Sequence, residues 1–213
     1  EVIIINRENY FVFQPMLSEV VGGSLDVKDT INPLRRLLPK SKLYIREVDS
    51  IDIENKKVIL APKYSHKKQV LSYDHIVLSL GNVTDFRGIP GLHEHALPFK
   101  NLADSLTIRN QIIDVIEAAS CEDDIELKKK LLTFVIGGGG FSGTEVAAEL
   151  NDFVRNFAKG YKEIDPSLIR VVLVHSKSRL LDRELSESLG NYAGALLQKR
   201  GVEILFNTHL SSA

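Results

Sequence analysis

Three glycines in this sequence have a spacing that suits the phosphates of a dinucleotide. Gly138, Gly140 and Gly143 give the pattern G-x-G-x-x-G within the stretch FVIGGGGFSGTE. In such a pattern the first glycine permits a tight turn, the second lets the backbone approach a pyrophosphate, and the third allows close helix–strand packing. A helix that starts at the turn also offers its free N–H groups to the phosphates. The motif predicts a dinucleotide site, and a purely structural glycine turn is the alternative.

The elements expected around this turn support the binding interpretation. From residue 131 onward the hydrophobic pattern predicts strand, helix, strand, helix and strand, over residues 131–136, the turn to about 157, 171–174, 186–199 and 202–207. This order is the mononucleotide-binding half of a doubly wound α/β sheet. Phe141 and Ser142 lie inside the turn and are predicted to contact the cofactor together with the glycines.

The tip of the second predicted strand should carry an acidic residue for the adenosine ribose. That position is His175, in the stretch VVLVHSKSR. A carboxylate would repel a 2′-phosphate, whereas His175 would not, and Ser176, Lys177 and Arg179 could attract one. The pattern therefore predicts a relaxed choice between NADH and NADPH. The alternative is that other residues contact the ribose.

Glu145 is the charged side chain closest to the glycine motif. It follows Gly143 by two residues, at the start of the predicted helix, where it would point toward the pocket. An acidic residue at this position also stabilises the helix dipole. A structural role alone is therefore the alternative to a role in the site.

The front of the chain has a different pattern. The β-branched run 2–5 predicts a strand buried on both faces. Residues 42–62 predict strands joined by a hairpin turn at ENKK, and residues 75–80 predict an apolar strand that ends at Gly81. A helix is expected over about 102–119, and the polar stretch SCEDDIELKKK after it is the best candidate for a domain boundary, although it suggests a short helical turn.

Composition excludes several classes of function. The chain has 213 residues with 27 basic and 28 acidic side chains, so its charge gives no argument for binding nucleic acid or anionic lipid. Its apolar runs are far shorter than the ~20 residues of a membrane span. Cys121 is its one cysteine, which excludes an internal disulfide and a CxxC redox pair. We predict no metal site.

Three segments together resemble one family. They are NYFVFQPMLSEVVGGSL, YDHIVLSLGNVTDFRGIPGLHEHALPFKNLADSLTIRNQI and FVIGGGGFSGTEVAAELNDF. In this order they resemble type II (alternative) NADH:quinone oxidoreductases, of the FAD-dependent pyridine nucleotide oxidoreductase superfamily. The resemblance implies two Rossmann-like domains, both incomplete in this chain: a partial FAD-binding domain over residues 1–96, and a partial NAD(P)H-binding domain over 97–213 with a connecting helix.

The same resemblance implies cofactor contacts. Asn6 takes the position where an acidic residue usually binds the FAD ribose, and its amide can form hydrogen bonds but lacks the charge. Leu80 and Gly81 match the connector that passes the cofactor, and Glu145 matches a residue near the nicotinamide. The segment near the isoalloxazine ring is matched by Phe13, Gln14, Pro15 and Leu17. For this aromatic stretch a local core is the alternative.

The activity implied is hydride transfer from NAD(P)H to FAD and electron transfer to quinone, in which no residue of this chain need act as acid or base. A location on the cytoplasmic side of a membrane, attachment through a C-terminal region outside this chain and a homodimer are further expectations. We expect the chain to be an internal part of a longer protein that by itself binds FAD poorly and lacks quinone reductase activity. Two other functions stay open: a non-catalytic NAD(H)-binding module, and a flavoprotein reductase with a protein electron acceptor.

Overall fold

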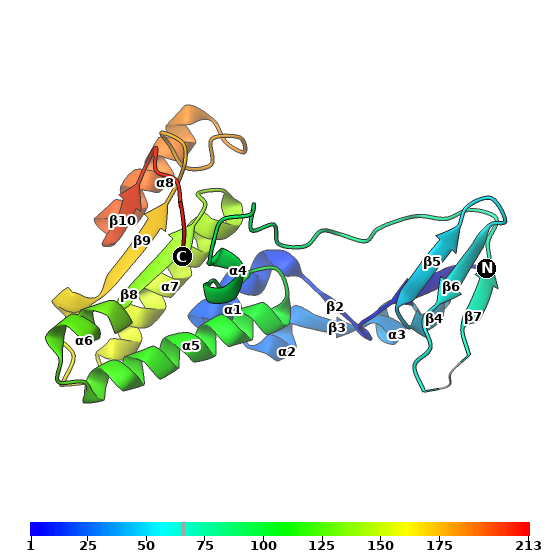
Figure 1. Cartoon of the computed structure of the whole chain (residues 1–213), viewed down its shortest axis with the longest axis horizontal. Coiled ribbons are helices and arrows are strands. Elements are labelled where there is room, and N and C mark those ends of the chain that lie inside the picture. The colour runs from blue at the N-terminus through cyan, green and yellow to red at the C-terminus, as the bar shows by residue number, and fades with distance from the viewer. Residues whose placement is uncertain (65–66) are drawn as a thin grey trace. The chain divides into compact units, whose positions relative to one another are not determined.

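The computed structural model describes residues 1–64 and 67–213, and these form two compact units (Figure 1). Unit 1 contains residues 1–13 and 28–83, and unit 2 contains residues 14–27 and 84–213. The segment 14–27 therefore packs with the later part of the chain, although it is close in sequence to the early strands. The predicted functional boundary between residues 96 and 97 is a separate matter and stays a prediction.

Unit 2 is built on a parallel three-stranded sheet of order β10-β9-β8. Its strands are β8 (Thr133–Gly137), β9 (Arg170–Val174) and β10 (Val202–Leu205), connected by helices α7 (Phe141–Ala158) and α8 (Glu187–Lys199). The register pairs Val135 with Val172 and Leu173 with Ile204. The predicted α/β order of strand, helix, strand, helix and strand is confirmed, as is the Rossmann-like fold of this half.

The middle strand explains why this unit folds around its sheet. From Val171 to Val174 every side chain of β9 is buried, as a run of apolar residues requires when strands flank it on both sides. Ala147, Leu150 and Val154 lie on one face of α7 and belong to the same core cluster. This spacing is the apolar stripe of an amphipathic helix packed on a sheet.

Further helices extend the core of unit 2. Helix α1 (Leu17–Gly22) packs on both α5 (Leu102–Cys121) and α7. Shorter elements complete the unit: η1 (Gln14–Met16), α4 (Leu92–His95), α6 (Ile125–Leu131) and η2 (Pro166–Leu168). Helix α6 contacts α5 and β8, so the polar stretch SCEDDIELKKK lies within the unit and is not a boundary between compact units. The prediction of a boundary there was wrong, because charged side chains on an exposed short helix resemble a linker in sequence.

Unit 1 consists of small sheets. The parallel pair is β1 (Ile3–Asn6) with β4 (Lys42–Ile45), and an antiparallel pair is β2 (Tyr10–Val12) with β3 (Ile31–Pro33). The third sheet contains β5 (Val48–Asp52), β6 (Lys57–Leu60) and β7 (Gln69–Ser72), with short helices α2 (Val27–Thr30) and α3 (Leu34–Leu37) elsewhere along the chain. The expected hairpin turn joins β5 to β6, and Lys56 takes the left-handed conformation there (φ 51°).

Two expectations for unit 1 were wrong. Strand β1 is not buried on both faces, since Val2 is 63% exposed and Ile3 also reaches solvent. Residues 75–80 form no strand, and Leu80 is 80% exposed. A run that is apolar on both faces forms a buried strand only where neighbouring strands accept its hydrogen bonds. In the described part of the chain β1 pairs only with β4, and no strand pairs with residues 75–80.

Within the described residues, none of the helices combines the length and the apolar character that crossing a bilayer requires.

Candidate dinucleotide site

The glycine turn of unit 2 has the geometry that the sequence pattern predicts. Gly138 follows β8 with φ 104°, a conformation that side chains disfavour, and its N–H donates to the Val174 carbonyl at 2.8 Å. A Cβ added to Gly143 would overlap the Gly138 carbonyl oxygen, so the first turn of α7 lies directly on the glycine turn. Gly140 is the N-cap of α7, and no side chain caps the free N–H groups at this helix end. The N–H groups of this first turn are thus able to bind phosphate oxygens.

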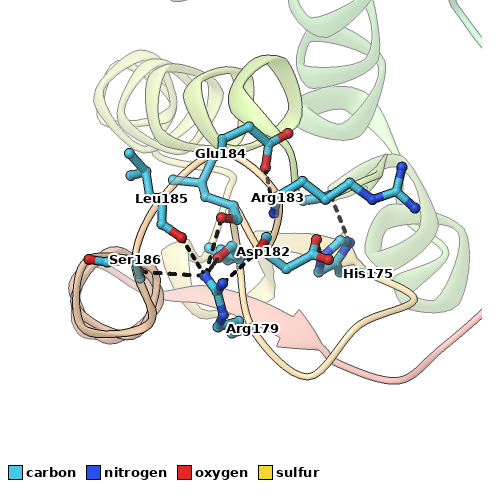
Figure 2. A network of polar contacts seen from close by, with 10 residues as sticks. His175, Arg179, Asp182, Arg183, Glu184, Leu185 and Ser186 are labelled. Atoms are coloured by element: carbon cyan, nitrogen blue, oxygen red, sulfur yellow. Dashed lines mark hydrogen bonds and ion pairs between the residues drawn. The ribbon is translucent and has the colours of Figure 1, made fainter.

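His175 supports the turn from beneath. The Nδ1 atom of His175 accepts a hydrogen bond from the Gly139 N–H at 3.1 Å, and the imidazole is buried, with 8% of the residue exposed. Because Nδ1 accepts, a neutral ring carries its proton on Nε2, which lies 3.4 Å from Oδ1 of Asp182 (Figure 2). The side chain at the strand tip is therefore held between the turn and a loop, and little of it faces solvent.

Arg179 organises that loop, which we call the 179–186 loop. Its guanidinium donates to the backbone carbonyls of Asp182 at 2.7 Å, Leu185 at 3.1 Å and Leu181 at 3.2 Å (Figure 2). The Leu181 N–H donates in turn to the Gly139 carbonyl at 2.8 Å. Arg179 thus fixes the backbone of the loop, and Leu181 attaches the loop to the glycine turn. Its predicted attraction for a 2′-phosphate is untested, and the exposed Lys177 is the cation of that segment with the more open side chain.

Two acidic residues of this loop were missed by sequence reasoning. Asp182 lies beside His175, and Oε1 of Glu184 lies 3.0 Å from the position of a Cβ built on Gly140. The stretch LLDRELSE carries both carboxylates, but nothing in its spacing shows that the loop folds back onto the turn. The one signal in the sequence is that the strand tip carries His175 in place of an acid.

Glu145 is the fifth residue of α7, just after its first turn, and its side chain is exposed. Partial desolvation and the negative charge of Glu19 on α1 raise the pKa of the Glu145 carboxyl above its ordinary value. Glu19 accepts a hydrogen bond from the Ser18 hydroxyl at 2.8 Å, and Glu149 accepts one from Ser24 at 3.1 Å. Helices α1 and α7 therefore bring carboxylates together, and Glu19 is a member of this group that the sequence did not reveal.

The other predicted contacts are divided between the units. Unit 1 contains Asn6, Phe13, Leu80 and Gly81, and unit 2 contains Gln14, Pro15, Leu17, Phe141 and Ser142. The Asn6 amide donates to the Glu8 carbonyl at 2.9 Å, which leaves its Oδ1 as an acceptor, and Gly81 has φ 68°. Leu17 is buried in α1 with 2% exposed, so it packs in the core of unit 2. As cofactor contacts, all of these residues remain predictions.

Comparison with known proteins gives consistent relatives. Over residues 1–213 the sequence matches the family described as pyridine nucleotide-disulphide oxidoreductase. It is 30% identical to an external alternative NAD(P)H-ubiquinone oxidoreductase B4 of Arabidopsis thaliana mitochondria, covering 96% of this chain and 36% of that protein. It is 31% identical to a type II NADH:quinone oxidoreductase of Staphylococcus epidermidis, covering 98% of this chain and 50% of the relative. The chain thus spans between about a third and a half of the length of these relatives.

Solved structures agree with the sequence matches. NDH2 from Plasmodium falciparum in complex with NADH superposes with a TM-score of 0.91 at 26% identity, covering 100% of this chain and 44% of that one. A covalent putidaredoxin reductase–putidaredoxin complex has a TM-score of 0.68 at 21% identity, with 98% of this chain and 44% of that chain covered, and shows a shared fold only. The predicted resemblance to type II NADH dehydrogenases is therefore confirmed, and the chain belongs to the pyridine nucleotide-disulphide oxidoreductase family.

Proposed function

We propose that this chain is the nucleotide-binding and flavin-contacting part of a type II NADH:quinone oxidoreductase. The observation that carries the proposal is the glycine turn, in which Gly138 adopts a left-handed conformation and Gly143 lets α7 start against the turn. This arrangement directs N–H groups and the positive end of the helix dipole at a pyrophosphate. The proposed ligand of this turn is NADH or NADPH, because the relatives carry NADH or NAD(P)H in their names.

The residues of unit 2 then have distinct roles. The phosphates bind at the N-terminus of α7, which is formed by Gly140, Phe141 and Ser142. His175 holds the turn through the Gly139 N–H. Glu145 positions the nicotinamide end by its polarity and hydrogen-bonding oxygens. No proton abstraction is assigned to Glu145, because the hydride transfer itself belongs to the cofactors.

FAD is the cofactor that the family membership favours, and the residues of the chain are compatible with it. When bound, FAD accepts the hydride and passes two electrons to a quinone. The Oδ1 acceptor of Asn6 at the end of β1 suits a ribose hydroxyl, and the exposed Leu80 and Gly81 offer backbone groups to a ligand. The segment from Phe13 to Leu17 completes the proposed flavin contacts. Residues 1–96 are the proposed flavin-domain part, and residues 97–213 the proposed NAD(P)H-domain part.

The cysteine content of this chain provides no disulfide acceptor within it. Cys121, the one cysteine of the sequence, is free and exposed at the end of α5. Disulfide reduction through an internal thiol pair needs two cysteines in contact. A quinone requires none. Because quinones dissolve in bilayers, we also propose that the protein acts at a membrane surface. Its location on the cytoplasmic side and a homodimer are further parts of the proposal.

The test of the function uses the longer protein that contains this chain, reconstituted with FAD, because we expect the chain alone to bind FAD poorly. NADH is mixed with it in a stopped-flow instrument, and the flavin absorbance is followed before and after a water-soluble quinone is added. We expect bleaching of the flavin by NADH and its recovery with quinone. Recovery only with a ferredoxin-type protein would identify a protein-directed reductase. NADH binding without flavin bleaching would identify a binding module. Either result would contradict the proposal.

A further inference from the structure

We propose that Asp182 is the residue that recognises the adenosine ribose, and that it makes this chain select NADH over NADPH. The inference rests on the proposed function, because it concerns the nucleotide bound at the glycine turn. It replaces the relaxed choice that the sequence pattern predicts at His175.

The first step is that His175 is not available as the ribose ligand. Its Nδ1 atom is occupied by the Gly139 N–H, and its Nε2 atom faces Asp182. The side chain is buried beneath the turn. A ligand that approached the imidazole would have to break the contact that holds Gly139 in place. The strand tip thus gives support to the turn, and recognition of the ribose falls to a neighbouring group.

The second step is that Asp182 lies where such a group is needed. Its Oδ1 is 3.4 Å from Nε2 of His175, so the carboxylate lies next to the tip of β9, and its side chain is 25% exposed. In dinucleotide-binding folds an acidic side chain at this strand tip binds the 2′-hydroxyl of the ribose. Here the loop supplies the carboxylate that the strand lacks.

The third step is that the carboxylate is held in position. The Asp182 carbonyl accepts a hydrogen bond from Arg179, and the neighbouring Leu181 N–H binds the Gly139 carbonyl. The residue before Asp182 therefore attaches the loop to the glycine turn, and Arg179 fixes the backbone of the loop at Asp182 itself (Figure 2). A fixed acceptor loses less entropy on binding than a mobile one.

The charges around the site then decide the choice of nucleotide. A carboxylate accepts hydrogen bonds from ribose hydroxyls, but it repels a 2′-phosphate at the same position. Glu184 carries the second negative charge of the loop, but it lies beside Gly140, where the pyrophosphate shared by both nucleotides is expected, so its charge acts on NADH and NADPH alike. Of the cations nearby, Arg179 is engaged with backbone carbonyls, whereas Lys177 and Arg183 are exposed.

The test compares binding of NADH and NADPH to the purified chain by nucleotide fluorescence, with circular dichroism as a check on folding. Wild-type protein should bind NADH at least about tenfold more tightly than NADPH, a difference of about 1.4 kcal/mol. In Asp182→Asn the NADH affinity should fall several-fold, and the ratio of the two affinities should approach one. The matched control is Glu184→Gln, which removes a charge from the same loop beside Gly140 and should change both affinities in parallel.

Several outcomes would overturn the inference. Equal affinities in the wild type would refute it while leaving the nucleotide-binding function intact, as would an unchanged ratio in folded Asp182→Asn. If Glu184→Gln changed the ratio as much as Asp182→Asn did, the selectivity would be a general effect of loop charge. If neither nucleotide bound the wild type, the proposed function itself would fail. If Asp182→Asn does not fold, the ratio of NADH to NADPH affinity in the wild type and in Asp182→Ser tests the inference in the same way.

Discussion

The two compact units differ in how completely they bury their apolar residues. The large core cluster lies in unit 2, and it includes Ile116, Leu173 and Leu180, none of which is exposed to solvent. In the described part of unit 1 the buried apolar side chains are Leu34, Val58 and Leu60. Unit 1 also has large apolar side chains in solvent, such as Val77 and Val83.

The reason for this difference is the set of partners available to each strand. In unit 2, β9 has a strand on each side and α7 packed against it. In unit 1, β1 has one neighbour, β4, in a two-stranded sheet. Two-stranded sheets are marginal by themselves, whereas a parallel sheet covered by helices buries long apolar runs. We conclude that the proposed nucleotide site lies in the unit that has the larger core.

The largest expected effect comes from truncating a buried leucine in each unit. Leu173→Ala in β9 should lower the free energy of unfolding by about 2–5 kcal/mol, because it leaves a cavity in the core beneath the site, and should weaken NADH binding. Leu60→Ala in β6 should destabilise unit 1 and leave NADH affinity unchanged. Denaturant melts followed by circular dichroism, and NADH titrations, provide the measurement. Equal losses of NADH affinity would break the comparison.

A smaller effect is expected from filling space at the glycine turn. Gly143→Ala would place a methyl group on the Gly138 carbonyl oxygen, which should cost about 1–3 kcal/mol and greatly reduce nucleotide affinity. Gly160→Ala is the matched control, since its Cβ would lie 3.5 Å from the Phe157 carbonyl oxygen, an ordinary contact. Isothermal titration with NADH and thermal melts test both. If Gly143→Ala bound NADH as tightly as the wild type, the close packing of α7 on the glycine turn would not be needed for nucleotide binding.

Much of unit 2 could be predicted from the sequence, because its patterns are local. The alternation of apolar runs and helical stripes from residue 131 onward located β8, α7, β9, α8 and β10 within a few residues, and G-x-G-x-x-G located the turn. Residues 75–80 have an equally apolar pattern, yet they form no strand. Hydrophobic pattern indicates that a segment can be a strand, but the partner that completes the sheet is a tertiary property.

The same limit explains the candidate site. The positions of Gly138 and Glu145 follow from spacing along one turn and one helix. The roles of His175 and Arg179 do not, because each depends on the path of the 179–186 loop, which brings Asp182 and Glu184 back to the turn. A single sequence without structure shows the type of side chain at the strand tip. It does not show that the side chain is already hydrogen-bonded to Gly139.

Helix capping offers a finer comparison between the units. Helix α5 starts with a capping box, in which the Asn101 side chain accepts from the Asp104 N–H at 3.0 Å and Asp104 accepts from the Asn101 N–H at 3.0 Å. Helix α3 in unit 1 starts at Leu34, and its N-cap residue, Pro33, provides no capping side chain. Asn101→Ala should therefore cost about 1 kcal/mol. Thermal melts should show this loss, and Asn101→Asp, which keeps an acceptor, should restore most of it.

The smallest effect concerns two carboxyl groups whose pKa values are shifted in opposite directions. The pKa of Glu145 in unit 2 is raised by desolvation and by Glu19, so the folded state is destabilised as the pH rises through that pKa. Glu145→Gln should then stabilise the protein at pH 7, by less than about 1 kcal/mol because the side chain is exposed, and the gain should vanish below the ordinary pKa of a glutamate.

Asp52 in the unit 1 hairpin gives the opposite sign. Hydrogen bonds from Asn55 lower the pKa of the Asp52 carboxyl, so its stabilisation is present above the ordinary pKa of an aspartate and is lost as the pH falls through the lowered value. Asp52→Ala should therefore destabilise the hairpin at pH 7 and have progressively less effect in acid. Urea melts of both variants would test this at pH values between about 3 and 7, the range in which carboxyl groups titrate. If the stability change had the same sign of pH dependence in both variants, the carboxylates of α1 and α7 would not repel one another. The electrostatic surroundings of Glu145 would then resemble those of Asp52 in an ordinary surface turn.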